Sequence, residues 1–282
     1  SLNNARQWGV LILAATPIGN LGDASPRLKE ALVDARFIAA EDTRSLLLLA
    51  SLLQIKLNAK LFSLHEHNET ERMAQIIEIA KDETVVVVSD AGMPTVSDPG
   101  FALVRAAAQA GIEITVVPGP SAVLAALSVS GLPTDRFTFE GFLPRKGSDR
   151  RKTFKSLANE VRTMVFFESP HRMHESLQDA AAVLGADRKA SVSRELTKKF
   201  EHTERGTLTQ LIEWAAGDPK GEMVLVIAGA AAVEVDTQDL VSVVNALVAD
   251  GMKLKEAVSE VAATNKASKS ELYQLVLDSR TA

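Results

Sequence analysis

The chain has 282 residues, of which 46% are hydrophobic and 24% charged, and these proportions are those of a folded, water-soluble protein. Its formal net charge of -5 lacks the positive field that dedicated nucleic-acid binders usually carry, and the absence of cysteine excludes disulfides and thiolate metal sites. Every apolar stretch is interrupted before membrane-spanning length, so we expect a cytoplasmic protein without membrane contact.

Apolar runs followed by polar loops and helical patterns recur along the first half of the chain. Residues 9–15 form the first run, and Ser25-Pro26 then has the pattern of a helix N-cap with a first-turn proline. Residues 37–40, 85–88 and 112–117 are further runs without polar alternation, which is typical of strands buried on both faces of a parallel sheet. Alternating strands and helices predict an α/β domain whose strand-end loops share one edge.

The loop that follows residues 85–88 is the strongest candidate for a ligand site. Open parallel sheets bind ligands beyond the carboxyl ends of their strands. The two glycines and two prolines of residues 89–100 set the backbone path and let main-chain atoms approach a ligand closely. Asp98 before Pro99 also has the pattern of a helix N-cap, so capping is the alternative for Asp98. Asp90 has no adjacent helix to cap, and we interpret it as functional.

The second half of the chain changes character at Gly131-Leu132-Pro133-Thr134, which we interpret as a linker. Strands are predicted around residues 137–142, 163–167, 189–192 and 222–228, with helices between them. We therefore predict two α/β domains, residues 1–130 and residues 131–233.

Residues 234–282 are predicted to form a small helical domain. Leucines and valines recur there with one-faced helical spacing, and Ser268 with Glu271 has the pattern of a capping box. Three short helices in this order resemble a helix-turn-helix, a motif that binds nucleic acid in some proteins and only packs in others.

Six of the eleven residues from 145 to 155 are basic. A local patch of this kind can bind phosphate where the whole chain is acidic, and the alternative is a solvated loop and helix face. The six are Arg145, Lys146, Arg150, Arg151, Lys152 and Lys155.

Three familiar signatures are absent: G-x-G-x-x-G after the first strand, G-x-x-x-x-G-K-[ST] and G-x-S-x-G. Nicotinamide, nucleoside-triphosphate and serine-hydrolase functions therefore lose their main support. The pairs His65/His67 and His171/His174 lack the carboxylate pattern of a known zinc site, so we expect no metal.

Seven segments in order resemble the small-subunit ribosomal RNA methyltransferase I group, a branch of the tetrapyrrole methylase superfamily. The resemblance spans nearly the whole chain. Corrin and sirohaem methylases are less similar, because their first loop typically has a Pro-Gly-Asp core where this chain has Pro17-Ile18-Gly19-Asn20. The segments are residues 16–23, 41–44, 65–69, 89–100, 118–122, 168–172 and 194–198.

The resemblance implies that S-adenosylmethionine, the methyl donor, binds in a cleft between two α/β domains. It also implies transfer to a cytidine ribose 2′-hydroxyl of small-subunit ribosomal RNA, free or in the assembled subunit, by a homodimer. Asp90 and main-chain groups of Ala91 and Gly92 are candidates to hydrogen-bond the donor. The family's donor-binding positions correspond to Pro17, Ala91, Gly92, Met93, Val96, Ser121, Ala122, and Phe167 or Glu168.

A ribose hydroxyl must lose its proton when it attacks, so a base is expected near it. The candidates are Asp98, Glu168, His171 and Lys198, and each has a structural alternative: helix capping, loop hydrogen bonding, helix-start packing and surface charge, respectively. Phosphate contacts, which position RNA without reading its sequence, are expected from Arg44, Arg172 and the basic segment 145–155.

Two other functions remain open from the sequence. A methylase of a small tetrapyrrole-like molecule would transfer methyl groups without RNA and give the basic segment no role. An inactive ribosome-associated protein would bind RNA or subunits but no donor. The intact loops 90–100 and 118–122 argue against loss of activity.

Overall fold

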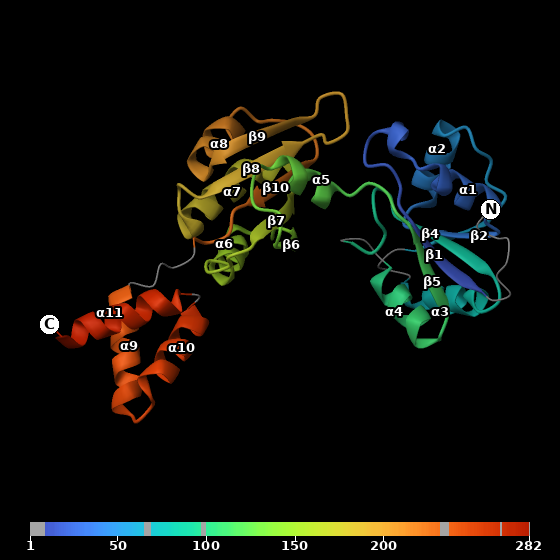
Figure 1. Cartoon of the computed structure of the whole chain (residues 1–282). Coiled ribbons are helices and arrows are strands. Elements are labelled where there is room, and N and C mark those ends of the chain that lie inside the picture. The colour runs from blue at the N-terminus through green and yellow to red at the C-terminus, as the bar shows by residue number, and fades with distance from the viewer. Residues whose placement is uncertain (1–8, 65–68, 97–99, 232–236, 266, 282) are drawn as a thin grey trace. The chain divides into compact units, whose positions relative to one another are not determined.

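The computed structural model describes residues 9–64, 69–96, 100–231, 237–265 and 267–281. It divides into two compact units, Ser1–Ala230 and Ala231–Ala282. The first unit holds two five-stranded sheets with the strand orders β3-β2-β4-β1-β5 and β6-β7-β10-β8-β9 (Figure 1). Two α/β sheets followed by C-terminal helices are the predicted fold class, which is thereby confirmed.

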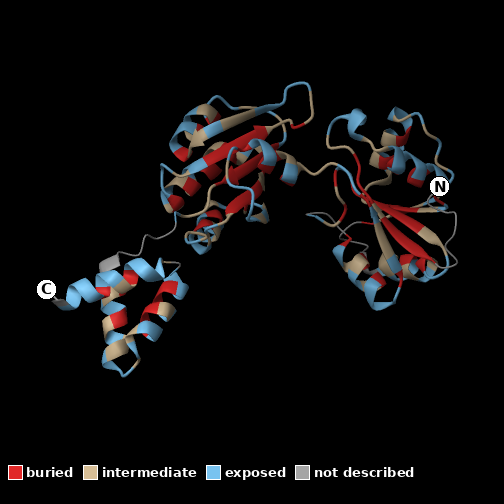
Figure 2. Cartoon of the chain, in the orientation of Figure 1, coloured by how far each residue is buried: buried red, intermediate tan, exposed pale blue. Residues whose placement is uncertain are grey.

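The strands of the first sheet all pair in parallel, as the buried apolar runs predicted. Helices α1 and α2 cover one face and α3 and α4 cover the other, so the strands are buried on both sides (Figure 2). The Ser25 hydroxyl accepts a hydrogen bond from the Leu28 amide, which starts α1 where the sequence predicted. The elements are β1 (Val10–Ala14), the 3₁₀ helix η1 (Leu21–Asp23), α1 (Pro26–Asp34), β2 (Phe37–Ala40), α2 (Thr43–Leu52), β3 (Lys60–Ser63), α3 (Glu69–Ala80), β4 (Thr84–Val88), α4 (Phe101–Gln109) and β5 (Glu113–Val117).

The second sheet is mixed. Strand β6 runs parallel to β7, whereas β10 is antiparallel to both β7 and β8, and β9 is antiparallel to β8. Phe154, Met173 and Leu211 belong to helices that pack on one face, around Phe166 and Leu225. The elements are α5 (Ala122–Val129), β6 (Phe137–Phe142), α6 (Gly147–Ser156), β7 (Thr163–Glu168), α7 (Pro170–Leu184), β8 (Lys189–Arg194), β9 (His202–Thr207), α8 (Leu208–Ala215) and β10 (Met223–Ile227).

Helix α5 follows the last strand of the first sheet but packs on the second sheet. Its Val123, Ala126 and Leu127 are buried against Val165 and Val226. A short apolar helix carries no sequence signal for the sheet it will cover. The chain therefore passes from the first sheet to the core of the second at residues 118–121, and the boundary at residue 130 stays a prediction.

Strands β3 and β9 were not predicted from the sequence. Both lie at the edge of a sheet, and their burial is low: one of the four residues of β3 and none of the six residues of β9 is buried. Strand β9, His-Thr-Glu-Arg-Gly-Thr, has no apolar residue, so neither a buried run nor apolar alternation marks it.

The described residues of the C-terminal unit form three helices, α9 (Thr237–Ala249), α10 (Leu254–Asn265) and α11 (Lys269–Thr281). Leu240, Val244, Val258, Leu272 and Val276 form its buried core. Across the described part of the whole chain, no helix combines the length and apolar character needed to cross a membrane.

Candidate functional site

Strands β1 and β4 are neighbours whose following helices lie on opposite faces of the first sheet. Helix α1 packs with Ile12 in one core, whereas Leu103 of α4 packs with Leu11 in the other. Where neighbouring strands send their connections to opposite faces, a crevice opens beyond their carboxyl ends. The loops after β1 and β4 therefore border the place where ligands bind in open α/β sheets.

Two backbone hydrogen bonds join these loops. The Thr16 amide donates to the Gly92 carbonyl at 3.0 Å, and the Gly92 amide donates to the Thr16 carbonyl at 3.1 Å. Gly92 has a φ of 78°, and a Cβ there would lie 3.3 Å from Ile18 Cγ2 and 3.4 Å from the Pro120 carbonyl oxygen. The loops after β1, β4 and β5 thus converge on Gly92, whose own amide hydrogen is used by Thr16.

Apolar residues flank the Thr16–Gly92 bridge along the chain. Ala91 and Val96 are exposed, and Pro17 and Met93 are partly exposed. Thr95 has a φ of 76°, a strained conformation for a β-branched residue that clusters at functional sites. Pro17, Ala91, Met93 and Val96 therefore offer accessible apolar groups in the segments next to the bridge.

Asp90 connects the β4 loop to the loop after β2. Its carboxylate accepts a hydrogen bond from the Asp42 amide at 3.2 Å. Asp42 caps α2 through the Arg44 amide and pairs with the Arg44 guanidinium at 2.7 Å, and these hydrogen bonds lower the pKa of Asp42 to about 2. Arg44 therefore extends into solvent with its guanidinium already paired to one carboxylate.

Ser121 lies where the chain passes from the first sheet to α5. Its hydroxyl accepts a hydrogen bond from the Leu124 amide at 3.4 Å, which caps α5, and its own O–H remains a donor by chemistry. Ala122 then packs against the apolar cluster that α5 forms with the second sheet. Helix α5 thus brings Ser121 and Ala122 to the hydrophobic cluster against which Phe167 of β7 also packs.

Glu168 lies at the end of β7 with a side chain that is 0% exposed. Its carboxylate accepts hydrogen bonds from the Ser169 amide at 2.6 Å, the Ser176 hydroxyl at 2.6 Å and Arg172 Nε at 3.1 Å. The Arg172 guanidinium, expected to bind phosphate, neutralises this buried carboxylate. Three donors and full burial fit the loop-bonding alternative for Glu168 better than proton transfer.

Lys198 forms ion pairs with Glu195 at 3.1 Å and Glu222 at 2.8 Å. Burial lowers the pKa of Lys198, but the hydrogen bonds to both carboxylates outweigh burial and raise the pKa above its ordinary value. A lysine held protonated in this way cannot accept a proton at neutral pH. Its aliphatic stem lies against Gly19, where a Cβ would come within 2.6 Å.

The segment around Lys198 contains strained residues that the sequence analysis did not select. Glu195 and Thr197 have φ values of 52° and 70°. The Thr197 carbonyl accepts a hydrogen bond from the Asn20 side chain at 3.1 Å, which joins the first loop of the first sheet to the second α/β region. Neither a positive φ at a non-glycine residue nor a hydrogen bond between residues 177 positions apart has a sequence signature, so both became visible only in the folded structure.

His171 is exposed at the second residue of α7, whose N-cap is Ser169 and whose first residue is Pro170. Asp98 lies outside the described residues, as do His65 and His67. The described helix α4 begins at Phe101 with Gly100 as its N-cap, at a φ of 119°. Among the described residues, no three His, Asp or Glu side chains are grouped closely enough to hold a metal ion.

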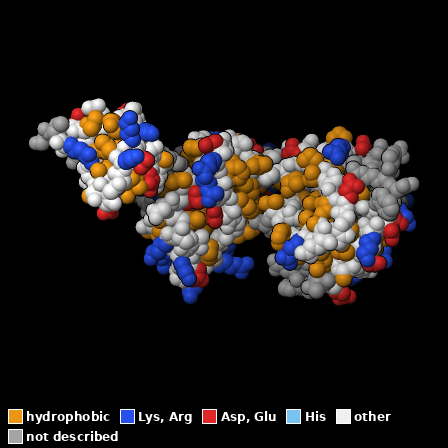
Figure 3. Space-filling model, turned by 60° about the horizontal axis from the view of Figure 1, so that its bottom comes forward, with side chains coloured by type: hydrophobic (Ala, Val, Ile, Leu, Met, Phe, Trp, Pro, Cys, Tyr) orange, Lys and Arg blue, Asp and Glu red, His pale blue; other side chains and the backbone are white. Residues whose placement is uncertain are grey.

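The basic segment divides into inward and outward residues. Arg150 is 3% exposed, and its Nε donates to Asp179 Oδ2 at 2.7 Å, so it serves the fold and not a phosphate. Figure 3 shows Lys and Arg side chains gathered at one edge of the second α/β region. The exposed members of the segment are Arg145, Lys146, Arg151, Lys152 and Lys155.

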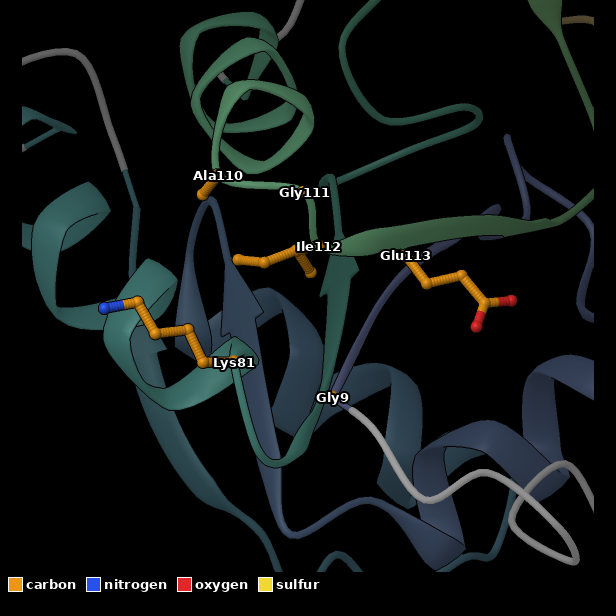
Figure 4. A pocket seen from close by; sticks show the side chains of 6 residues that line it. All are labelled: Gly9, Lys81, Ala110, Gly111, Ile112 and Glu113. Carbon is orange, nitrogen blue, oxygen red and sulfur yellow. The ribbon is translucent and has the colours of Figure 1, made fainter.

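A pocket of about 290 Å³ lies at the opposite end of the first sheet (Figure 4). It is lined by Gly9, Lys81 and residues 110–113, which precede or begin β1, β4 and β5. Amino-terminal strand ends are not where open parallel sheets bind ligands, and this pocket contains none of the predicted site residues.

The family model for Tetrapyrrole (Corrin/Porphyrin) Methylases matches residues 10–212. The chain therefore belongs to the tetrapyrrole methylase family. Among solved structures, the methyltransferase CobJ covers 79% of this chain and 95% of its own with a TM-score of 0.58 at 21% identity. Diphthine synthase covers 78% of this chain and 89% of its own with a TM-score of 0.57 at 17% identity. These two likenesses support the fold.

Curated relatives named Ribosomal RNA small subunit methyltransferase I match over nearly the full length. The Mycobacterium tuberculosis protein is 48% identical over 274 residues, which is 96% of this chain and 96% of that protein. The Escherichia coli O157:H7 protein is 41% identical over 274 residues, covering 96% of this chain and 95% of that protein. The resemblance read from the seven segments is thus confirmed.

Proposed function

We propose that this chain transfers the methyl group of S-adenosylmethionine to the 2′-hydroxyl of a cytidine ribose in small-subunit ribosomal RNA. The observation that carries the proposal is the identity of 41–48% over 96% of the chain to proteins named Ribosomal RNA small subunit methyltransferase I. The convergence of three strand-end loops on Gly92 supports a ligand site of the kind that such an enzyme needs.

The predicted donor-binding residues suit the proposed donor chemically. Its adenine and thioether need apolar walls, which Met93, Val96, Ala122 and Phe167 supply, while the Ser121 hydroxyl and the Asp90 carboxylate can meet polar groups. When bound, the donor supplies an electrophilic methyl group on a positively charged sulfur. A carboxylate near that charge favours binding, and the absent side chain of Gly92 lets the backbone approach the ligand closely.

The acceptor hydroxyl loses its proton as its oxygen forms the new bond to carbon. Glu168 is buried and accepts three hydrogen bonds, and Lys198 is held protonated, so we assign the base to His171 or Asp98. His171 is exposed at the start of α7, and histidine is the side chain most often used for proton transfer. Alignment of the hydroxyl with the methyl group supplies the rest of the acceleration.

Exposed cations of the segment 145–155 and Arg44 are the proposed phosphate contacts. Arg145, Lys146, Arg151 and Lys152 extend from one short helix and its N-terminal approach. Phosphate contacts of this kind hold RNA in register and explain how a chain of net charge -5 can bind a polyanion through one region.

We also propose that the chain acts as a homodimer. Helix α2 leaves Leu47, Leu48 and Leu52 exposed, an apolar patch directly after the Asp42–Arg44 segment. A second copy of the chain would remove these side chains from water. Analytical ultracentrifugation of the wild type and of Leu48→Glu tests this, and an unchanged sedimentation coefficient in the variant would argue against α2 as the interface.

Methyl transfer from labelled S-adenosylmethionine to small ribosomal subunits tests the proposed function directly. Subunits from cells lacking this protein should gain label on one ribose, which nuclease mapping would locate. Donor binding in calorimetry without labelling of subunits or free RNA would favour a methylase of a small molecule. Absence of donor binding as well would favour an inactive ribosome-binding protein.

A further inference from the structure

Phe142 is an exposed aromatic residue at the end of β6, directly before the basic segment. The residue is 64% exposed, although its ring packs edge-on against Phe167 at a centroid distance of 5.3 Å. Phe167 packs in turn against Phe139 at 5.0 Å. The ring is therefore supported by a row of aromatic neighbours while most of its surface stays in contact with water.

A β-bulge places Phe142 on this face. Phe139 pairs with Val165 and Phe142 pairs with Phe167, so three steps along β6 match two along β7. Side chains alternate between faces, and a regular strand would therefore turn Phe142 away from Phe139. The extra residue, accommodated by Gly141 at a φ of 74°, returns Phe142 to the face of Phe167.

The backbone between Phe142 and α6 is held at several points. The Leu143 amide donates to the Phe167 carbonyl at 3.1 Å. The buried Arg150 guanidinium donates to the carbonyls of Pro144 at 3.4 Å and Arg145 at 3.2 Å, and it is anchored by Asp179. Arg150 thus orders the segment that connects the aromatic ring to the exposed cations.

The cations next to this ring suit a phosphate. Arg145 and Lys146 are exposed, and three residues of chain keep the Cα atoms of Phe142 and Arg145 within about 11 Å of each other. Two other exposed rings are already partnered by cations: Arg105 lies 5.6 Å from the Phe101 ring and Lys199 lies 5.4 Å from the Phe200 ring.

An ordered aromatic ring beside a pair of cations is the arrangement with which proteins hold unpaired nucleotides, because every base has a face that can stack. We propose that Phe142, Arg145 and Lys146 form a subsite for one unpaired nucleotide of the RNA, whose base stacks on Phe142. Arg145 and Lys146 bind the adjoining phosphate, and Arg150 is a positioning residue that orders their segment. This inference rests on the proposed function.

The test compares Phe142→Ala, Phe142→Leu and Phe142→Trp in methyl transfer to small subunits from cells lacking this protein. Loss of one stacked base predicts a fall in kcat/KM of about 5- to 150-fold for Phe142→Ala. Phe142→Leu should remain impaired because it is apolar but cannot stack, and Phe142→Trp should restore activity. Phe137→Ala, at the opposite end of β6, is the matched control and should retain wild-type kcat/KM.

Two further measurements separate stacking from other roles. Calorimetry with S-adenosylmethionine should give the same affinity for Phe142→Ala as for the wild type, and a parallel loss would overturn the subsite by assigning Phe142 to the donor. The second measurement is the affinity for the subunits at several salt concentrations. Phe142→Ala should leave the slope of log affinity against log salt concentration unchanged, whereas Arg145→Gln should reduce that slope by about one.

The inference and the proposed function fail in different ways. Subunit methylation by the wild-type chain establishes the function independently of Phe142. If Phe142→Ala or Phe142→Leu then equals the wild type in kcat/KM, the subsite is overturned and the function stands. If the wild type itself leaves subunits unmethylated, both proposals are overturned together.

Discussion

Thr16 and Gly92 exchange two backbone hydrogen bonds between the loops that follow β1 and β4. These residues lie 76 positions apart in the chain, yet their pairing continues the contact of β1 with β4 past the end of both strands. The bridge fixes the two loops relative to each other before any ligand arrives. A site ordered in advance loses less conformational entropy on binding.

Gly92→Ala should weaken donor binding as well as stability. A side chain at a φ of 78° costs about 1–2 kcal/mol, and the added Cβ would meet Ile18 and Pro120. Gly111→Ala is the control, because Gly111 has a φ of 71°, open space around its Cβ position and a place at the other end of the sheet. Urea unfolding should show a loss of stability in both variants, and calorimetry a loss of donor affinity in Gly92→Ala alone.

Arg150 and Arg151 are neighbours in the chain, but we expect them to contribute very differently to the free energy of unfolding. Arg150→Met removes a guanidinium that is 3% exposed from Asp179, which is 12% exposed, and should lower the free energy of unfolding by about 3 kcal/mol. Arg151→Met removes the second guanidinium that pairs with Asp179. Because the Arg151 side chain is 48% exposed, this change should lower the free energy of unfolding by less than about 1 kcal/mol. Equal losses in chemical denaturation would contradict the division of the segment into inward and outward residues.

Proton transfer should depend on His171 or Asp98 and not on Lys198. Removal of the base, in His171→Ala or Asp98→Asn, should lower kcat by about 10²- to 10⁴-fold. Lys198→Arg keeps the positive charge between Glu195 and Glu222 and should lower kcat by less than about tenfold. Single-turnover rates with saturating donor test this prediction. Loss of activity in Lys198→Arg would contradict it and would indicate that Lys198 takes part in proton transfer.

The Asp42 carboxylate should stabilise the fold at neutral pH and lose its effect in acid. Its folded pKa is lowered from 3.8 to about 2, chiefly by the hydrogen bonds from Arg44. The contribution is therefore fully present above pH 3.8 and is lost as the pH falls towards 2. Thermal melts of the wild type and Asp42→Asn should differ by a constant amount from pH 7 to 5 and converge below pH 4. A constant difference down to pH 3 would exclude this linkage.

Local sequence was sufficient wherever one segment carried its own signal. The valines of β4 are buried on both faces, so they form a run that only a parallel interior strand requires. Ser25 and Pro26 start α1 because capping depends on residues next to each other. Strand β9 escaped prediction because an edge strand can be wholly polar.

The sequence by itself therefore determined the two α/β regions, the helical C-terminal unit, the strand-end loops and the family, since each depends on residues close together in the chain or on ordered motifs. Only the tertiary structure decided which charges serve the fold. Arg150 turns inward because Asp179, 29 residues away in the chain, lies opposite it. Burial of a charge requires a partner that folding brings to it, and spacing along the chain does not reveal that partner.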